Sequence, residues 1–301
     1  MTPAAVKVRA QAKINLHLRV LARDVSGYHS IETIFHRIDL ADELIVSAVE
    51  SGRTLDVAGD DLGKVESNLA YRAAIAYQAL AGWPAGFRIE LTKKIPLGAG
   101  LGGGSADAAA VLRGLNSFAP SPLDESALLH LATGLGADVP FLTSDAVMAL
   151  AWGRGERMLS LPALPHRHVV LVTPEFRVVT ADAYAWLDAN RSLQDASTST
   201  TSRRDPNAIF SRESLSSWRA IAEMSVNDFL DPVVLRHPQI GELIESLSGT
   251  GPLLLSMSGS GSTVFSVYET LPEIMPIADL QNVIIGYSGT ADKVVQPIRM
   301  G

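Results

Sequence analysis

A glycine-rich segment and the helix expected after it carry the strongest chemical signal in this sequence. Five glycines occur among nine residues in PLGAGLGGG at 96–104, directly before SADAAAVLRGLN at 105–116. Backbone N–H groups in the first turn of a helix lack partners within the helix, and the helix dipole attracts anions to that end. Glycines let phosphate oxygens approach the backbone and allow positive φ. The pattern predicts a phosphate-binding loop, although a surface turn before a capped helix would use the same residues.

The expected loop differs from two common nucleotide-binding patterns. No Lys-Ser or Lys-Thr pair follows its last glycine, which excludes the P-loop pattern. No acidic residue ends a second parallel strand at the offset that a dinucleotide-binding fold requires. A second glycine-serine segment, SGSGS at 258–262, lies between two apolar runs. It could be a simple hairpin turn, or it could close over the same phosphates from the other side.

Asp138 and Lys13 form the candidate catalytic pair. Asp138, in GADVP at 136–140, could accept a proton from an alcohol during phosphoryl transfer, which needs mainly positioning and neutralised charge. The same aspartate could instead cap a helix with proline in its first turn. Lys13 shares the polar side of an alternating segment, 13–20, with Asn15. A lysine near Asp138 would favour the ionised carboxylate, whereas exposed strand lysines are more common.

Several further polar residues could contact a nucleotide or its metal ion. Lys93 and Lys94 precede the glycine loop, and one of them should point away because neighbours in a strand face opposite sides. Ser105 is expected to cap the following helix and could contact phosphate or magnesium. Asp107, in the first helical turn, is expected to complement the helix dipole. His29 can donate and accept hydrogen bonds, which suits the edge of a base, although single histidines are usually structural.

Strands and helices in mixed order must position these residues. Alternating or apolar runs predict strands over 13–20, 28–49, 87–95 and 169–174, and a strand, turn and strand within 252–268. Segments rich in alanine and leucine predict helices over 68–80, 105–116, 123–135 and 181–193. Clustered glycine, proline and charge at 153–168 predict a domain boundary there. The serine- and threonine-rich segment 195–207 has almost no apolar residues and is expected to be a mobile loop.

The composition indicates a soluble globular protein. Of the 301 residues, 47% are hydrophobic and 19% are charged, which excludes a disordered chain. The formal net charge of −7 argues against a broad basic surface for nucleic acid or anionic membrane. No cysteine occurs, so thiolate nucleophiles and zinc-thiolate sites are excluded. Neither a signal peptide nor an apolar run of about 18 residues is recognisable, and a cytoplasmic protein is expected.

The segment PLGAGLGGGSADAAA at 96–110 resembles the signature loop of the GHMP kinases, the superfamily that includes galactokinase, homoserine kinase and mevalonate kinase. Five more segments resemble, in order and spacing, the branch of this superfamily whose substrate carries a cytidine diphosphate group. They are AKINLHL at 12–18, SGYHSIETIF at 26–35, SNLAYRAA at 67–74, GADVPF at 136–141 and SGSGSTVF at 258–265. Because these segments span nearly the whole chain, the sequence is identified as a member of the GHMP kinases.

The resemblance implies an α+β fold of two domains with the active site in the cleft between them. Residues 1–160 would form the ATP-binding domain, which is ribosomal-protein-S5-domain-2-like. Residues 161–301 would form a ferredoxin-like, substrate-binding domain. The implied reaction transfers a phosphoryl group from ATP to the carbon-2 hydroxyl of a cytidine-diphosphate-linked alcohol in the non-mevalonate isoprenoid pathway. Mg²⁺ would arrive with the nucleotide, and no metal site is expected in the protein itself.

The resemblance also implies roles for individual residues. Asp138 would be the catalytic base and Lys13 its partner. The implied ATP-binding residues are Asn68, Lys93, Pro96, Gly98, Gly100, Leu101, Gly102, Gly103, Gly104 and Ser105. The implied substrate-binding residues are Asn15, Tyr28, His29, Thr180, Tyr184, Gly259, Ser260 and Gly261. Tyr184 would stack on cytosine, although its segment, VVTADAY at 178–184, is a loose match and aromatic residues on helices are more often core.

Two other functions remain open from the sequence. The same fold could phosphorylate homoserine, mevalonate or a sugar, in which case the GYH segment and Tyr184 would not recognise cytidine. The chain could also be a nucleotide sensor without catalysis, although the presence of both Lys13 and Asp138 argues against that. The expected partner is the small-molecule substrate, with no nucleic acid and no membrane. The protein is expected to be a monomer or a weak homodimer.

Overall fold

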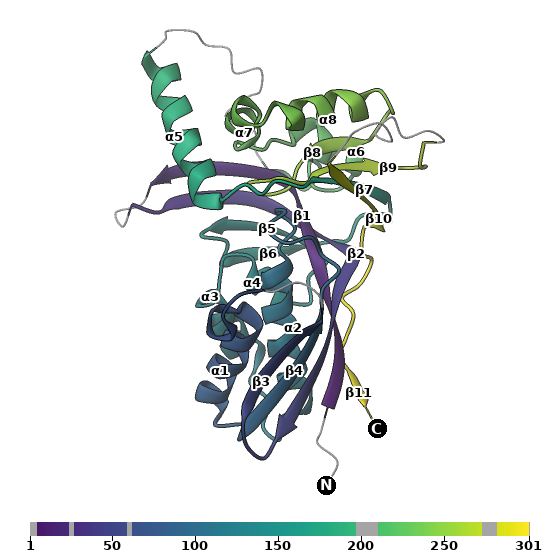
Figure 1. The fold of residues 1–301 in the computed structure, drawn as a ribbon. Helices are drawn as coiled ribbons and strands as arrows, with labels where there is room; N and C mark the ends of the chain where they lie inside the picture. Colours follow the sequence, from purple (N-terminus) through teal and green to yellow (C-terminus); the bar gives the residue numbers. More distant parts are fainter. Residues whose placement is uncertain (1–4, 24–26, 59–61, 197–209, 273–281, 301) are drawn as a thin grey trace.

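The computed structural model describes residues 5–23, 27–58, 62–196, 210–272 and 282–300. They form two bodies of mixed helix and strand, one above the other (Figure 1). The long strands β1 (Ala5–Arg23) and β2 (His29–Val49) run from the lower body to the upper one, and their ends project to one side. This arrangement brings the AKINL segment near the start of the chain close to the glycine-serine segment at 258–262.

The lower body is built on a seven-stranded sheet within the described residues. Besides β1 and β2, its strands are β3 (Arg53–Ala58), β4 (Gly86–Thr92), β5 (Met148–Gly153), β6 (Arg157–Leu161) and β11 (Ile298–Met300). The order is β11-β1-β2-β4-β3, with β5 paired to β2 and β6 paired to β5. The β1–β2 register shifts at three places, including between Gln11 and Lys13. Such irregularities bend a strand pair and redirect side chains.

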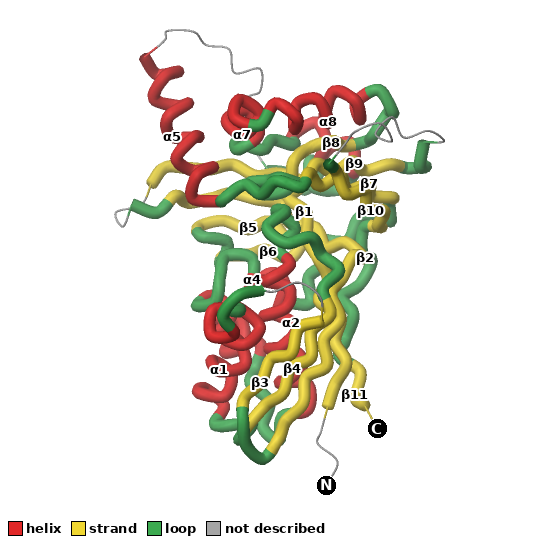
Figure 2. Tube along the Cα trace, viewed as in Figure 1, coloured by secondary structure: helices red, strands yellow, loops and turns green. Residues whose placement is uncertain are grey.

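Helices cover one face of the lower sheet (Figure 2). They are the short 3-10 helix η1 (Val65–Ser67), α1 (Leu69–Ala81), α2 (Gly103–Phe118), α3 (Glu125–Thr133) and α4 (Val139–Thr143). Helix α2 lies close against the sheet at Gly114, where an added Cβ would be 3.1 Å from Val8 Cγ2. Its alanines are buried, which suits a helix packed between a sheet and neighbouring helices.

The upper body contains a second, antiparallel sheet. Its strands are β7 (His168–Pro174), β8 (Leu254–Met257), β9 (Val264–Tyr268) and β10 (Val283–Gly289), in the order β10-β7-β9-β8. Its helices are α5 (Thr180–Ala196), α6 (Trp218–Met224), α7 (Leu230–Arg236) and α8 (Pro238–Ser248). Helices α7 and α8 lie above this sheet, and α5 stands beside the projecting ends of β1 and β2 (Figure 1).

Two hydrophobic cores cross the domain boundary expected at residue 160. The larger core, in the lower body, also contains Val169 and Trp218 from the second half of the chain. The smaller core contains Leu18 and Ile31 from β1 and β2. In addition, β11 pairs with β1, so the last strand belongs to the first sheet. The boundary itself stays a prediction, and the two bodies share apolar packing across it.

The predicted elements agree with the structure except in a few details. Ser105 was expected to cap α2, but the helix begins at Gly103 and its N-cap is Gly102, so that expectation is wrong. The strand expected over 87–95 ends at Thr92. The loop expected over 195–207 lies outside the described residues, apart from the two that end α5. Within the described ranges, no helix combines the length and apolar character needed to cross a membrane.

Candidate active site

Lys13 joins parts of the chain that are far apart in sequence. Its backbone N–H, on β1, donates to the Leu101 carbonyl at 3.0 Å. Its ammonium donates to Asn15 Oδ1 at 2.7 Å and to the Gly100 carbonyl at 3.0 Å, and lies 3.4 Å from Asp138 Oδ2. The side chain is almost fully buried, so these contacts fix its position. The structure therefore brings the two predicted catalytic residues together beside the glycine loop.

Asn15 is oriented by a short chain of hydrogen bonds. Its amide nitrogen donates to Thr33 Oγ1 at 2.8 Å, and the Thr33 hydroxyl donates to the His17 carbonyl at 2.7 Å. All three residues are buried. Because the amide nitrogen is committed to Thr33, the amide oxygen faces Lys13. Asn15 thus shares a face with Lys13, as the alternation predicted, and holds its ammonium in place.

Asp138 lies at the N-cap position of α4, but its side chain forms no capping hydrogen bond. Its backbone has φ −84° and ψ −17°, which is helical rather than the extended conformation usual for a capping residue. The carboxylate instead faces Lys13, and the side chain is 26% exposed. The Asp138 side chain therefore does not cap α4, and the helix-capping alternative is wrong. A partly accessible carboxylate beside an ammonium is suited to accept a proton from a substrate hydroxyl.

The glycine loop adopts backbone conformations that favour glycine. Gly98, Gly100 and Gly102 have φ of 67°, 78° and 72°, a region that costs other residues energy. An added Cβ on Gly100 would overlap the Ser258 carbonyl oxygen. The Ser258 hydroxyl donates to the Gly100 carbonyl at 2.8 Å. The loop and the glycine-serine turn at 258–262 are therefore in direct contact.

Helix α2 begins next to the candidate catalytic pair, Lys13 and Asp138. Its N-cap, Gly102, has no side chain to cap the N–H groups of the first turn, which leaves that end free to bind an anion. An added Cβ on Gly102 would lie 3.1 Å from Lys13 Cε and 3.4 Å from Asp138 Oδ2. Ser105 follows in the first turn, and its Oγ would be 3.9 Å from a Cβ added to Gly136. The backbone at the start of α2 therefore lies against both Lys13 and the Asp138 carboxylate.

Lys93 is bound beneath the loop rather than extended toward its surface. Its ammonium bonds to Asp42 and, at 2.7 Å, to Asp107, and all three side chains are buried. Asp42 Oδ1 also accepts the backbone N–H groups of the two residues after Lys93, at 2.5 and 2.8 Å. The ammonium of Lys93, which was expected to assist phosphate binding, is therefore paired with Asp42 and Asp107 inside the protein. Lys94 points away to Glu43, at 2.6 Å, as expected for one of the two lysines.

Asp107 has a different role from the one expected. It was predicted to lie in the first turn of its helix, but α2 begins earlier and the carboxylate faces Lys93. Burial raises the pKa of Asp107, and the charge of Lys93 opposes that rise. Asp107 thus fastens α2 to the segment that leads into the glycine loop, and the expected dipole role is wrong.

Asn68, the predicted adenine-pocket residue, lies where α1 and α2 begin together. It is the N-cap of α1, and its side-chain oxygen accepts the Ala70 N–H at 2.9 Å. An added Cβ on Gly104 would lie 3.6 Å from Leu69 Cδ1, which places the two helix starts in contact. Contact between Asn68 and adenine stays a prediction.

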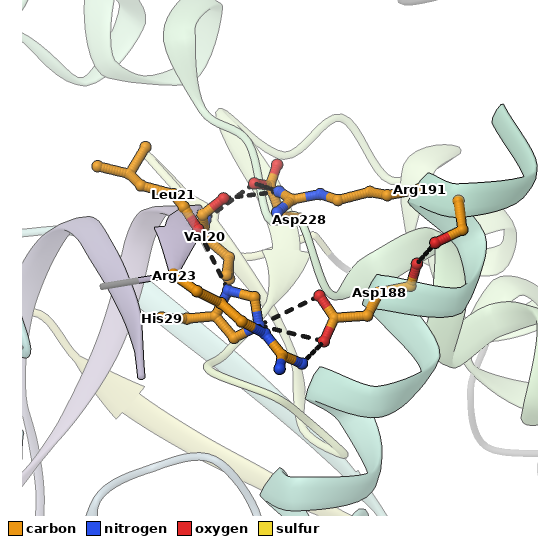
Figure 3. A network of polar contacts seen from close by, with 8 residues as sticks. Val20, Leu21, Arg23, His29, Asp188, Arg191 and Asp228 are labelled. Atoms are coloured by element: carbon orange, nitrogen blue, oxygen red, sulfur yellow. Dashed lines mark hydrogen bonds and ion pairs between the residues drawn. The ribbon is translucent and has the colours of Figure 1, made fainter. Parts of the chain in front are cut away.

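His29 and Tyr184, two of the predicted cytidine-binding residues, lie against each other. Their rings stack with centroids 5.1 Å apart and planes 11° apart. Figure 3 shows that both His29 ring nitrogens already have partners: Nδ1 lies 3.2 Å from the Leu21 carbonyl, and Nε2 lies 3.1 Å from Asp188 Oδ1. Arg23 bonds to both His29 and Asp188. A base that used the edge of His29 would therefore replace one of these contacts.

Tyr28 lies on the same side of the molecule. It is 42% exposed, and the Arg154 guanidinium lies over its ring at 4.4 Å. Burial raises the pKa of Tyr184 to about 12, with further contributions from Tyr28 and the charge of Asp138. Tyr28 directly precedes His29 in the chain, which places it near the stacked rings of His29 and Tyr184.

The predicted substrate residues of the second glycine segment also reach this region. Thr180 Oγ1, at the start of α5, lies 3.0 Å from Ser260 Oγ. A Cβ added to Gly259 would be 3.5 Å from Lys13 Nζ. Gly261 has φ 94° and lies against Met257. The turn therefore connects the start of α5 with Lys13.

Sequence reasoning missed Asp42, Arg23, Asp188 and Asn227. Asn227 holds the glycine-serine turn, because its amide nitrogen donates to the carbonyls of Met257 and Gly259 at 2.6 and 2.9 Å. Each missed residue contacts a partner far away in sequence. No local spacing could have identified them.

Comparison with known proteins links this geometry to a family. Residues 68–146 match the family described as GHMP kinases N terminal domain, and residues 211–275 match GHMP kinases C terminal. A relative from Citrifermentans bemidjiense, named 4-diphosphocytidyl-2-C-methyl-D-erythritol kinase, is 40% identical over 267 residues, covering 88% of this chain and 90% of that one. A Moorella thermoacetica relative of the same name is 40% identical over 259 residues, covering 86% and 88%.

This chain belongs to the 4-diphosphocytidyl-2-C-methyl-D-erythritol kinase family. A crystal structure of a 4-(cytidine 5'-diphospho)-2C-methyl-D-erythritol kinase matches it with TM-score 0.71 and 34% identity, covering 95% of this chain and 100% of that one. A homoserine kinase from Cytophaga hutchinsonii matches with TM-score 0.68 and 17% identity, covering 98% and 97%, which shows the fold alone. The predicted GHMP kinase membership, α+β fold and kinase class are confirmed. The ATP and substrate contacts assigned to single residues stay predictions.

Proposed function

We propose that this kinase transfers the terminal phosphoryl group of ATP to the carbon-2 hydroxyl of 4-diphosphocytidyl-2-C-methyl-D-erythritol, in the non-mevalonate isoprenoid pathway. The observation that carries the proposal is the contact of Lys13 with Asp138, at 3.4 Å, beside the bare backbone of Gly102. The identity of the acceptor is taken from the names of the relatives. The site offers the Asp138 carboxylate, which could accept the proton of that alcohol.

ATP would bind with its phosphates along the glycine loop and the first turn of α2. The fit is supported by the uncapped helix start and by the positive φ of Gly98, Gly100 and Gly102, where side chains would fill the cradle. Mg²⁺ that arrives with the nucleotide would neutralise phosphate charge. In the described part of the chain, no three His, Cys, Asp or Glu side chains form a metal cluster. We expect the phosphates, water and Ser105 to hold the ion, since Mg²⁺ usually keeps several waters and binds substrate phosphates.

Asp138 acts in this proposal as the general base. Its carboxylate accepts the proton of the substrate hydroxyl as the oxygen bonds to phosphorus. Lys13 lies 3.4 Å from that carboxylate and also donates to the Gly100 carbonyl, so it holds the carboxylate in place relative to the loop. Phosphoryl transfer needs little covalent assistance, so this positioning supplies most of what the reaction requires.

The cytidine group would bind between the projecting β1–β2 pair and α5. Tyr28 and Tyr184 offer aromatic faces there, and His29 offers a ring edge. Because His29 stacks on Tyr184 in this structure, a stacked base would take the place of that contact or use the other face of Tyr184. The turn residues Gly259 and Ser260 lie between this region and Lys13. They would face the diphosphate and the sugar alcohol.

The decisive test compares two aspartates at helix N-caps. Asp138→Ala should lower kcat by about 10²–10⁴ while ATP affinity changes little. Asp124 does cap its helix, accepting the Ala127 N–H at 2.8 Å. Asp124→Ala should therefore cost about 1 kcal/mol of stability and leave kcat unchanged. ADP release and thermal unfolding measure the two effects, and near-normal turnover of Asp138→Ala would remove Asp138 as base.

The acceptor is tested separately with the cytidine-diphosphate substrate beside homoserine, mevalonate and a sugar. We expect turnover with the cytidine substrate and none with the other alcohols. Turnover with another alcohol, and no thermal protection by cytidine nucleotides, would favour a different acceptor. ATP binding without ADP release from any alcohol would favour the nucleotide-sensor alternative.

A further inference from the structure

A buried column of two aromatic rings between two cations connects Lys13 with the helix that carries Asp138. Lys13 Nζ lies 5.7 Å from the centre of the Phe35 ring. Phe35 stacks on Phe141 of α4, with centroids 5.0 Å apart and planes at 18°. Arg37 Cζ lies 5.0 Å from the centre of the Phe141 ring, on the far end of the column. None of the four side chains is more than slightly exposed.

Arg37 also holds the C-terminal end of α4. Its Nε donates to the Ala146 carbonyl, and its Nη2 donates to the carbonyls of Phe141 and Ser144, each at 2.8 Å. The last carbonyls of a helix have no partners within it, and positive charge is favourable at that end. One guanidinium therefore satisfies both the end of the helix and the segment that follows it.

Arg37 is only 1% exposed, and among the described residues no acidic side chain forms an ion pair with it. Backbone carbonyls are its direct hydrogen-bond partners instead. Burial and the charge of Arg113 lower the pKa of Arg37 to about 9, and Asp145 partly opposes this. Burying a charge in this way is costly, and removing its partners is costlier still. The three carbonyls and the Phe141 ring are those partners, so Arg37 and α4 hold each other.

Helix α4 depends on such contacts because it has only five residues. A helix this short is unstable by itself. Asp138, at its start, forms no capping bond that would fix it locally. The position of the carboxylate therefore follows the position of α4 as a whole. A small displacement of α4 would move Asp138 relative to Lys13 and the acceptor hydroxyl.

We propose that Phe35, Phe141 and Arg37 are positioning residues, which hold α4 so that the Asp138 carboxylate meets the acceptor hydroxyl beside Lys13. The inference rests on the proposed function, in which Asp138 is the base. None of the three touches the reacting atoms. They act through the placement of α4, and their loss should therefore lower kcat more than it changes substrate binding.

The test is Phe141→Leu, with Phe87→Leu as its matched control. Phe87 is an equally buried ring at the end of β4 away from the glycine loop, and it packs on Tyr71. Both variants should lose similar stability in thermal unfolding. Phe141→Leu should lower kcat about tenfold, since small misplacement of a reacting group is costly, with KM for ATP and for the cytidine substrate within about twofold. Phe87→Leu should keep the wild-type kcat.

A double-mutant cycle tests whether Phe35 and Phe141 act together as one column or contribute independently to packing. Phe35→Leu and the double variant with Phe141→Leu should each show about the same loss of kcat as the single Phe141 variant, because either change breaks the same column. Losses that multiply, or a wild-type kcat in the folded Phe141→Leu protein, would overturn the proposal. If Phe141→Leu does not fold, Phe141→Met, which keeps more of the volume, is measured with the same expectations.

Asp138→Ala is assayed in parallel so that the two proposals can fail separately. If Asp138→Ala keeps its turnover, the proposed function is wrong about the base. If Asp138→Ala is inactive but Phe141→Leu turns over like the wild type, only the positioning role is wrong.

Discussion

Lys13 and Lys93 show how the surroundings of one residue type decide its role. Lys13 contacts the carboxylate of Asp138, which is partly exposed and therefore accessible from outside the protein. Lys93 contacts Asp42 and Asp107, which are both buried. The ammonium of Lys93 therefore fastens the segment before the glycine loop to α2. Exposure of the acidic partner, more than the lysine itself, distinguishes the candidate catalytic contact of Lys13 from the structural contact of Lys93.

His36 is expected to make the stability of the protein depend on pH. It is fully buried, it stacks on Trp218 at 5.5 Å, and its Nδ1 donates to the Arg37 carbonyl at 2.7 Å. Burial lowers the pKa of His36 from 6.5 to about 4, and its hydrogen bond to the backbone partly opposes this. The unfolded chain therefore binds a proton more readily than the folded one between these values. Stability should fall as pH drops from about 6.5 toward 4, by about 2–3 kcal/mol at pH near 4.5.

Urea unfolding between about pH 4.5 and pH 7.5 measures this dependence. His36→Phe keeps a ring against Trp218 but cannot titrate. The variant should show a shallower loss of stability on acidification than the wild type. Identical pH profiles for the two proteins would rule out His36 as a source of acid sensitivity.

Helix α5 acts as one element facing the projecting strands. Tyr184, Asp188 and Arg191 follow each other at spacings of four and three residues, which places them on one helix face. Tyr184 stacks on His29, and Asp188 bonds to His29 and Arg23. Arg191 donates to the Val20 carbonyl at 2.6 Å (Figure 3). The face of α5 thus sets the shape of the expected cytidine region.

Asp188→Ala should raise KM for the cytidine substrate about tenfold, the value of one hydrogen bond to a charged group. The pKa of Asp188 is lowered because the hydrogen bonds and charges of Arg23 and His29 outweigh the effect of burial, so the acid is ionised at neutral pH. Without it, His29 and Arg23 lose the partner that orients them. KM for ATP should stay the same.

Asp182→Ala is the control, because this aspartate lies on the exposed first turn of the same helix. It should leave both KM values unchanged. An unchanged KM for the cytidine substrate in Asp188→Ala would show that the face of α5 does not shape the substrate site.

Each of the two hydrophobic cores contains residues from both halves of the chain, and this shared packing joins the whole molecule. Val169 and Trp218 belong to the lower core, and Leu18 and Ile31 belong to the upper one. The glycine loop and the 258–262 turn, one from each half, touch at Gly100. The candidate active site therefore lies where the two bodies contact each other.

Thermal unfolding should accordingly show one cooperative transition rather than two. Shared cores make separate unfolding of the halves costly, because each half would expose apolar side chains of the other. Differential scanning calorimetry and intrinsic fluorescence should give the same Tm. Two resolved transitions, or a stable folded fragment of residues 1–160, would contradict this view.

Local chemistry made much of the fold predictable. The alternation around Lys13 predicted a strand, Asn68 and the alanines after it predicted α1, and five clustered glycines predicted the loop. These features depend on neighbours within a turn or two of chain. The start of α2 was misplaced because Ser105 looked like a cap, whereas positive φ at Gly102 lets the helix begin earlier.

The sequence by itself determined the family, the glycine loop and the candidates Lys13, Asp138, His29 and Tyr184, since residue type and short spacing carry that information. Only the tertiary structure decided which partners these residues meet. Asp188 lies 159 positions from His29, and Asp42 lies 51 positions from Lys93. Such contacts arise because burial of apolar side chains brings distant segments together, and no local pattern records which polar groups then face each other.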